Sequence, residues 1–285
     1  MKPAIRMVVT DLDNTLYDWV TFFTASFYRM VDVAAEKLGV TRDRLLDELR
    51  EVHRSHRNSE QPFALLETSA VKSRYPNATR SELAKEFRPV FQEFNRVRKE
   101  KLKLYAGVEE TLQRLQRNRI QVIGHTEATV PNALYRLRAL ELEPFFVRLY
   151  AATPSGSGHY DKERGESLLR TTIDVRYLRP GERKPDPRVL LDICREMGIA
   201  PQQTLYIGDS ISRDIGMAKG AGVWAAWAQY GAAFDPELGE RLARITHWSE
   251  EDIRRTKEAQ ARHGNAKPDR ALRYCISEIF DAFTF

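Results

Sequence analysis

The stretch IRMVVTDLDNT, residues 5–15, decides the fold. Residues 5–10 form an apolar run that stops at Asp11 and is bounded by polar turn residues, which is typical of a buried strand. Asp11 and Asp13 follow where the chain turns out of the sheet, so both carboxylates can face one pocket. Two close carboxylates repel each other unless they share a cation or a proton, and hard divalent metals prefer oxygen ligands. The pattern therefore favours a metal site behind the first strand.

Further segments repeat this strand character and alternate with helical patterns. Short runs rich in β-branched or aromatic residues predict strands at 120–125, 145–151, 204–208 and 223–228. Apolar spacing near three and four predicts helices at 108–118, 130–140, 187–197 and 211–221. The alternation of strand and helix predicts an α/β fold with a Rossmann-like parallel sheet, whose ligands bind at the carboxyl edge of the strands.

The chain between the first strand and the next core helix has a different pattern. Residues 20–104 contain helical periodicity without strands, and their aromatic residues are explained by the core of a helical bundle. We therefore predict an α/β core at residues 1–17 and 105–248, an inserted helical cap at 18–104, and a helical C-terminal extension at 249–285. The tract 152–182 is less regular: two loop-like runs flank LLRTTIDVRYL, which could form a pair of strands.

Composition excludes several classes of protein. Hydrophobic residues make up 42% of the 285 residues, charged residues 30%, and mean hydropathy is −0.50. No stretch approaches the roughly 20 apolar residues that span a bilayer, and the N-terminus does not resemble a signal peptide, so we expect a cytoplasmic protein. The net charge of +5 arises from 45 basic and 40 acidic residues mixed along the chain. Such mixing indicates solvated surface, and no nucleic-acid partner is expected.

Cysteine and histidine give no separate metal site. Cys194 and Cys275 are far apart and form no CxxC pair, which argues for packed thiols. His53 and His56 lie three apart on a predicted helix without an evident third ligand, so a solvated helix face is the preferred interpretation.

A second acidic constellation follows another predicted strand. The sequence GDSISRD, residues 208–214, places Asp209 and Asp214 at the carboxyl end of strand 204–208, where a helix begins. Asp209 and Ser210 could simply be helix N-caps, a role these residue types favour. In a parallel sheet, however, the ends of two such strands meet at one edge, and their acids can share a metal.

Two further residues lie between these constellations. Thr126 ends the strand 120–125, and Lys184 precedes Pro185 in a turn before a helix. A hydroxyl can donate to a phosphoryl oxygen, and an ammonium can neutralise its charge. Either residue alone would more simply be structural or solvated.

Taken in order, the four elements resemble the haloacid dehalogenase-like hydrolase superfamily. DxDxT, a threonine at a strand end, lysine before proline and GDxxxxD are all matched, over residues 1–17 and about 105–230. The insertion directly after the first motif resembles the family's helical cap of the first type. The resemblance implies a phosphohydrolase that forms an aspartyl-phosphate and uses Mg²⁺.

The resemblance also implies a role for each matched residue. Asp11 would be the nucleophile, and Asp13 would be the general acid and base whose backbone carbonyl joins the metal ligands. Asp209 would complete the metal ligands, and Asp214 would support the metal from outside its direct ligands or through water. Thr126 and Lys184 would hold the phosphoryl group of a small phosphorylated substrate.

One departure and several alternatives accompany this prediction. Many relatives have Asn or Gly after the threonine, whereas this chain has Glu127, a carboxylate that would repel phosphate unless it is paired or points away. A dehalogenase of the same fold would lack the second aspartate, so Asp13 argues against one. A phosphomutase keeps both aspartates, and a non-catalytic binding or regulatory protein on this fold is the alternative from another class.

Overall fold

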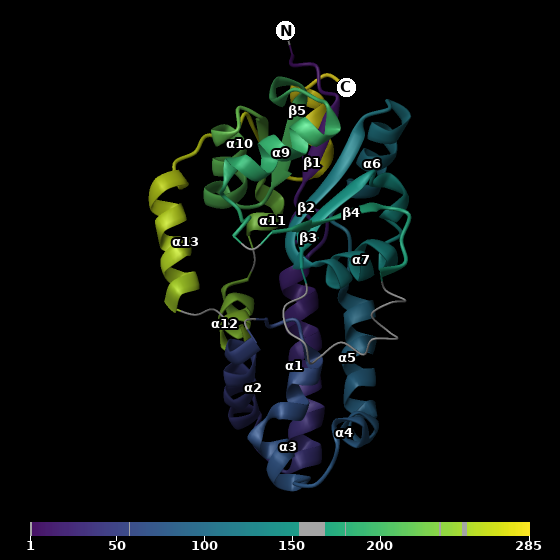
Figure 1. Ribbon diagram of the computed structural model, residues 1–285, viewed down its shortest axis with the longest axis vertical. Helices are drawn as coiled ribbons and strands as arrows, with labels where there is room; N and C mark the ends of the chain where they lie inside the picture. The colour runs from purple at the N-terminus through teal and green to yellow at the C-terminus, as the bar shows by residue number, and fades with distance from the viewer. Residues whose placement is uncertain (1, 57, 154–168, 180, 234, 247–249) are drawn as a thin grey trace.

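The chain folds into a parallel sheet flanked by helices and a helical cap at its far end (Figure 1). The computed structural model describes residues 2–56, 58–153, 169–179, 181–233, 235–246 and 250–285. The glycine-bearing tract 154–158 lies outside the described residues. Among the described residues, no helix combines the length and apolar character that crossing a membrane requires.

The sheet has seven strands in the order β4-β3-β2-β1-β5-β6-β7, and every neighbouring pair is parallel. The strands are β1 (Met7–Thr10), β2 (Gln121–Thr129), β3 (Arg148–Ala152), β4 (Asp174–Leu178), β5 (Thr204–Gly208), β6 (Trp224–Ala228) and β7 (Arg270–Leu272). All four residues of β1 are buried, because β2 and β5 flank the strand and helices cover both faces. This parallel α/β sheet with an inserted cap confirms the predicted fold class.

Alternation along β1 divides the core into two apolar layers. Val8 faces a layer that includes Leu112 and Leu134, whereas Met7 and Val9 face the opposite layer. Successive side chains of a strand point to opposite faces, so a continuous apolar run is what a doubly covered strand requires. The helices of the core are α6 (Val108–Arg117), α7 (Val130–Ala139), α9 (Pro187–Met197), α10 (Gly216–Gly220) and α11 (Gln229–Ala232).

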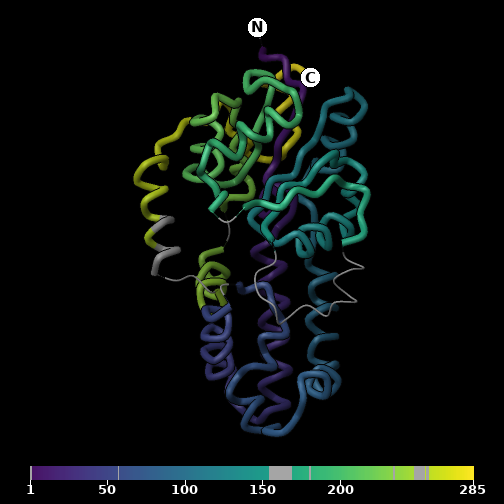
Figure 2. The backbone as a smooth tube through the Cα atoms, in the orientation of Figure 1, coloured from purple at the N-terminus to yellow at the C-terminus, as the bar shows by residue number. Residues whose placement is uncertain are grey.

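Short helices and the C-terminal segment complete the fold. The short helices are η2 (Glu143–Phe145), η3 (Pro201–Gln203), η5 (Ile276–Glu278) and the π-helix η4 (Ile211–Ile215). Residues 249–285 were predicted to be a helical extension in two segments, broken near residues 263–268. They form α13 (Glu250–His263) and α14 (Ile279–Ala282), but also β7, which pairs with β6 at the edge of the sheet. Figure 2 shows this segment returning to the N-terminus, where Ile5 N donates to Thr284 O at 2.7 Å.

The cap consists of α1 (Trp19–Leu38), α2 (Arg42–His56), η1 (Pro62–Glu67), α3 (Ser69–Arg74), α4 (Arg80–Glu86) and α5 (Arg88–Lys101). Asp18 begins α1 by accepting a hydrogen bond from Thr21 N at 3.0 Å, and Gly39 ends it in the left-handed conformation, with φ 67°. The aromatic residues predicted to form the bundle core are buried or packed against it, with Phe27 and Phe87 fully buried.

Helix α12 (Pro236–Ile245) lies against the cap rather than the sheet (Figure 1). It packs on α1 and α2, and Arg244 pairs with Asp43 at 2.8 Å. The prediction of a solvated face for His53 is wrong: its side chain is fully buried, and Nδ1 lies 2.6 Å from Ile245 O. His56 pairs with Glu67 at 2.8 Å. The helical pattern around His53 could not predict its contact with α12, because that helix comes from a distant part of the chain.

The substitution His53→Ala tests the attachment of α12 to the cap. It removes a buried ring that packs edge-on against Phe27 and deprives Ile245 O of its hydrogen-bond partner. We expect a loss of about 2 to 4 kcal/mol in the free energy of unfolding, measured by urea denaturation. Arg54→Ala, which breaks only an exposed pair with Glu51, is the control and should cost less than about 0.5 kcal/mol. Equal losses in the two variants would contradict this role of His53.

Candidate active site

The predicted site residues gather at the carboxyl ends of three adjacent strands. Asp11 follows β1 and Asp209 follows β5, but Thr126 does not end its strand as predicted: it lies inside β2, which continues to Thr129 past a register shift. Thr10 pairs with Gly124 of β2 on one side and with Ile207 of β5 on the other. The chain order of the strands changes direction at β1, and open parallel sheets form their ligand sites at such a point.

The loop after β1 turns sharply before the cap begins. Leu16 N donates to Leu12 O at 2.8 Å, and Asn14 adopts the left-handed conformation with φ 56°. The Asn14 side-chain oxygen then accepts from Trp19 N and Val20 N at 3.2 and 3.3 Å. Asparagine tolerates this backbone conformation better than most residues. The loop therefore presents Asp11 and Asp13 at the sheet edge and starts α1 immediately afterwards.

Lys184 joins two of the predicted acids. Its Nζ lies 2.6 Å from Asp11 Oδ1 and 2.8 Å from Asp214 Oδ1, and only 4% of its side chain is exposed. Burial alone would lower the pKa of Lys184, but the two carboxylates outweigh it and hold the pKa well above its usual value. The ammonium therefore stays charged and fixes the orientation of Asp11.

Three carboxylates crowd this edge of the sheet. One oxygen each from Asp11, Asp209 and Asp214 lies within 4.8 Å of the others. Burial, with a contribution from Asp214 and against the pull of Lys184, raises the pKa of Asp11 to about 6. Burial, together with Asp214 and Asp11, raises the pKa of Asp209 well above its usual range. Clustered oxygen donors with excess negative charge fit a hard divalent cation such as Mg²⁺.

Gly208 and the π-helix η4 bring Asp214 into the cluster. A Cβ at Gly208 would collide with the Asp214 carboxylate, so only glycine permits this close approach. Asp214 Oδ2 accepts from Ser210 N at 3.0 Å, and Tyr206 donates its hydroxyl to Oδ1 at 3.2 Å. Ser210, whose hydroxyl accepts from Arg213 N, is the residue that caps η4. The capping alternative is therefore realised by Ser210.

Glu127 is paired and does not stand as a free carboxylate. It forms an ion pair with Arg213 and accepts a hydrogen bond from Lys184 N at 3.1 Å. Glu127, which departs from the family pattern, thus attaches the turn that carries Lys184 to the end of β2. Thr126, which is 1% exposed, accepts from Ala128 N at 3.0 Å, so its hydroxyl hydrogen can still be donated to another acceptor.

His125 packs behind the acids and was not assigned a role from the sequence. It is fully buried, with Nδ1 3.3 Å from the Tyr206 hydroxyl, which also donates to Asp214. Burial, together with Lys184 and Arg213, lowers the pKa of His125 well below its usual value. The imidazole is therefore neutral and supports Asp214 through Tyr206 without adding charge.

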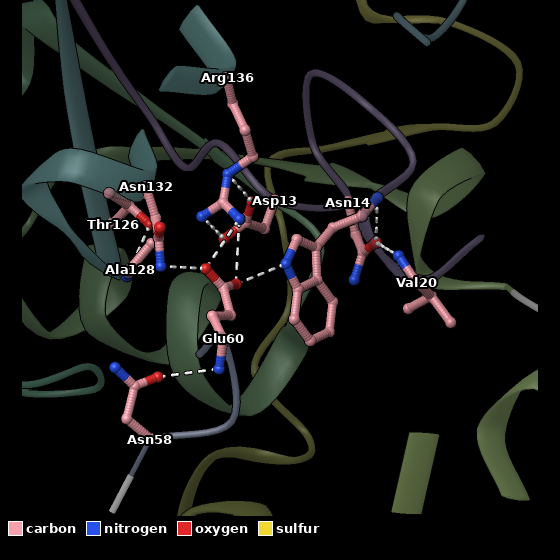
Figure 3. A network of polar contacts seen from close by, with 10 residues as sticks. Asp13, Asn14, Val20, Asn58, Glu60, Thr126, Ala128, Asn132 and Arg136 are labelled. Carbon is pink, nitrogen blue, oxygen red and sulfur yellow. Dashed lines mark hydrogen bonds and ion pairs between the residues drawn. The ribbon is translucent and has the colours of Figure 1, made fainter. Parts of the chain in front are cut away.

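Asp13 points to a different set of partners from Asp11. Its carboxylate lies 3.4 Å from Arg136 of α7, and Arg136 in turn contacts Glu60 of the cap at 3.0 Å (Figure 3). Burial raises the pKa of Asp13, and Arg136 opposes that shift. The Asp13 carboxylate does not belong to the three-carboxylate cluster among the described residues. Neither Arg136 nor Glu60 lies in a motif, and only the fold brings them to Asp13.

Comparison with known proteins identifies the family. The model of the haloacid dehalogenase-like hydrolase family matches residues 5–222, which contain every site residue described above. The chain belongs to this family.

Relatives of this haloacid dehalogenase-like hydrolase include named phosphatases. A probable phosphoglycolate phosphatase of Pseudomonas putida is 30% identical over 128 residues, which cover 45% of this chain and 41% of that protein. The match thus spans about two fifths of the relative's length. Among solved structures, a 2-haloacid dehalogenase from Pseudomonas syringae has a TM-score of 0.57 at 20% identity, covering 98% of this chain and 97% of its own. A phosphatase from Thermococcus onnurineus has a TM-score of 0.53 at 16% identity, covering 99% and 100%.

The substitution Lys184→Met tests the charge balance of the site. It leaves Asp11 and Asp214 buried together without their ammonium, so we expect a loss of about 3 to 5 kcal/mol in the free energy of unfolding at pH 7. Adding Asp214→Asn should recover part of that loss. Lys219→Met, which breaks an exposed pair with Asp269, should cost less than about 1 kcal/mol. Urea denaturation without divalent cations measures all four proteins, and no recovery in the double variant would refute the charge argument.

Proposed function

We propose that this hydrolase is a Mg²⁺-dependent phosphatase that cleaves small phosphomonoesters through an aspartyl-phosphate. The observation that carries the proposal is the arrangement of Asp11, which is held by Lys184 within a cluster of acids, with Asp13 two residues further along the same loop. The matched family model supports the hydrolase chemistry. The relative named as a probable phosphoglycolate phosphatase supports phosphomonoesters as the substrate class.

The first step transfers the phosphoryl group to the protein. A carboxylate oxygen of Asp11 attacks phosphorus, and the bond between phosphorus and the ester oxygen breaks as the acyl phosphate forms. Protonated Asp13 gives its proton to the departing oxygen, which leaves as an alcohol. Thr126 donates a hydrogen bond to the phosphoryl group, and Lys184 offsets its negative charge, since such transfers depend mainly on positioning and charge stabilisation.

The second step returns the protein to its starting state. Asp13, now ionised, removes a proton from water as the water oxygen attacks phosphorus. The bond between phosphorus and Asp11 breaks, inorganic phosphate is released, and Asp11 is again a carboxylate. Atoms and charges balance over the two steps, and Asp13 begins the next cycle protonated.

The residues that would hold Mg²⁺ are Asp11 and Asp209, the backbone carbonyl of Asp13, and Asp214 directly or through water. The three clustered carboxylates are paired with a single ammonium, and the negative charge that remains favours a divalent cation. The ion supplies charge neutralisation, which lets an anionic phosphoryl group approach an anionic nucleophile.

The substitutions Asp11→Asn and Asp13→Asn test the assigned roles. Phosphate release would be measured from phosphoglycolate, sugar phosphates and nucleotides, with Asp47→Asn on the cap surface as the control. We expect Asp11→Asn to lose all measurable turnover, because an amide cannot form the acyl phosphate. Asp13→Asn should lower kcat by about 10² to 10⁴-fold, the usual contribution of general acid and base catalysis.

Several outcomes of the same assays would decide against a phosphatase. Unchanged turnover in Asp11→Asn would refute the assignment of Asp11 as the nucleophile. Release of halide from 2-haloacids would support the dehalogenase alternative, and transfer of phosphate within a sugar phosphate without release to water would support a phosphomutase. Absence of turnover across the panel would favour a binding protein on the same fold.

Binding of Mg²⁺ provides a second test that does not depend on turnover. The cation relieves repulsion among the acids, so millimolar Mg²⁺ should raise the midpoint of thermal unfolding by several degrees, following the linkage of binding to stability. Asp209→Asn should reduce this shift to near zero while the protein remains folded. An equal shift in the wild type and in Asp209→Asn would place the bound ion elsewhere.

A further inference from the structure

A carboxylate from the cap lies beside the proposed acid and base. Glu60 accepts a hydrogen bond from Trp19 Nε1 at 2.7 Å, from Asn132 Nδ2 at 2.6 Å and from Arg136 Nη1 at 3.0 Å (Figure 3). Its own backbone N donates to Asn58 Oδ1 at 2.9 Å. A surface residue placed by chance would not collect three side-chain donors from two separate helices. Glu60 is therefore fixed at the boundary between cap and core.

Arg136 connects Glu60 to Asp13. It extends from α7, which begins directly after the strand that carries Thr126, and only 2% of its side chain is exposed. Nη1 faces both carboxylate oxygens of Glu60 at 3.0 Å, while Nε and Nη2 lie 3.4 Å from the two oxygens of Asp13. A planar guanidinium offers donors along two edges, which suits it to bridge two carboxylates in a fixed orientation.

We propose that Arg136 and Glu60 are positioning residues for Asp13. Glu60 fixes the guanidinium of Arg136, and the guanidinium holds the Asp13 carboxyl group in the orientation from which it reaches the leaving oxygen. The cap thereby completes the acid and base machinery of the core. This inference rests on the proposed function, since it assigns a task to Asp13 only within that mechanism.

The contacts distinguish this role from two simpler ones. A strut between cap and core would need only the pair of Glu60 and Arg136, yet the guanidinium also faces Asp13. A site for an anionic part of the substrate would need a free guanidinium edge, yet two carboxylates already occupy Arg136. Both alternatives predict kinetics that differ from those of a positioning residue.

The test uses aryl phosphates whose leaving groups differ in acidity. A 2,4-dinitrophenolate departs without a proton, whereas phenolate from phenyl phosphate needs general acid assistance. For Arg136→Met we expect kcat/KM to fall about 10²-fold with phenyl phosphate, within the range of general acid catalysis, and less than about fivefold with 2,4-dinitrophenyl phosphate. Glu60→Gln should show the same selectivity with a smaller loss, and Arg136→Lys should restore part of the rate.

Two comparisons make the result specific to this pair. The double variant Glu60→Gln/Arg136→Met should lose no more than Arg136→Met alone, because Glu60 acts only through the guanidinium. Arg138→Met is the matched control, because Arg138 lies on the same helix but pairs with Glu143 instead of Asp13. It should leave kcat/KM unchanged with both substrates. Thermal unfolding of each variant checks that it is folded, and Glu60→Gln and Arg136→Lys carry the test if Arg136→Met does not fold.

Three results would overturn the inference. Equal losses with both substrates would indicate a structural strut, and a change confined to KM would indicate contact with substrate. Additive losses in the double variant would separate Glu60 from Arg136. If the proposed function itself is wrong, Asp11→Asn will still turn over 2,4-dinitrophenyl phosphate. If Asp11→Asn is inactive but the Arg136 and Glu60 variants lose equal activity with both aryl phosphates, only the positioning role fails.

Discussion

Repulsion among the carboxylates that follow β1 and β5 is the constraint on which the rest of the site depends. Oxygens of Asp11, Asp209 and Asp214 lie within 4.8 Å of one another, and two unit charges at that distance repel by about 3 kcal/mol or more at an effective dielectric constant near 20. A domain is stable by only about 5 to 15 kcal/mol, so this repulsion must be balanced locally. Lys184, in contact with two of the three acids, supplies the balance within the protein.

Residues without a chemical role are explained by the same constraint. Gly208 lacks a side chain because the Asp214 carboxylate lies against its backbone, and Tyr206, on the same strand, donates a hydrogen bond to that carboxylate. Glu127 holds the backbone of Lys184 at the end of β2, which keeps the ammonium in place. Glu127 departs from the residue that many relatives have after the threonine, but it holds in place the only ammonium that contacts the acids among the described residues.

The sequence predicts those parts of the molecule that depend on local pattern. Strands β1, β2, β3, β5 and β6 and the helices between them follow from buried apolar runs and helical spacing, and the order of the motifs places their acids at one sheet edge. Strand β4 is one strand of the pair suggested for LLRTTIDVRYL, whereas β7 has only three residues at the sheet edge and was not predicted. Glu60, Arg136 and His53 could not be assigned, because their partners are distant in sequence and meet only after folding.

The attachment of the cap explains why a cap residue can act at Asp13. The chain leaves the core through the loop that carries Asp13 and returns beside it, where Asp18 N donates to Lys103 O at 3.2 Å and Tyr105 N donates to Leu16 O at 3.0 Å. These hydrogen bonds join the two connections between cap and core beside the loop that carries Asp13. Arg136, held by Glu60 of the cap, contacts the Asp13 carboxylate itself. Asp13 is therefore held by both domains, whereas Asp11 is held by residues of the core alone.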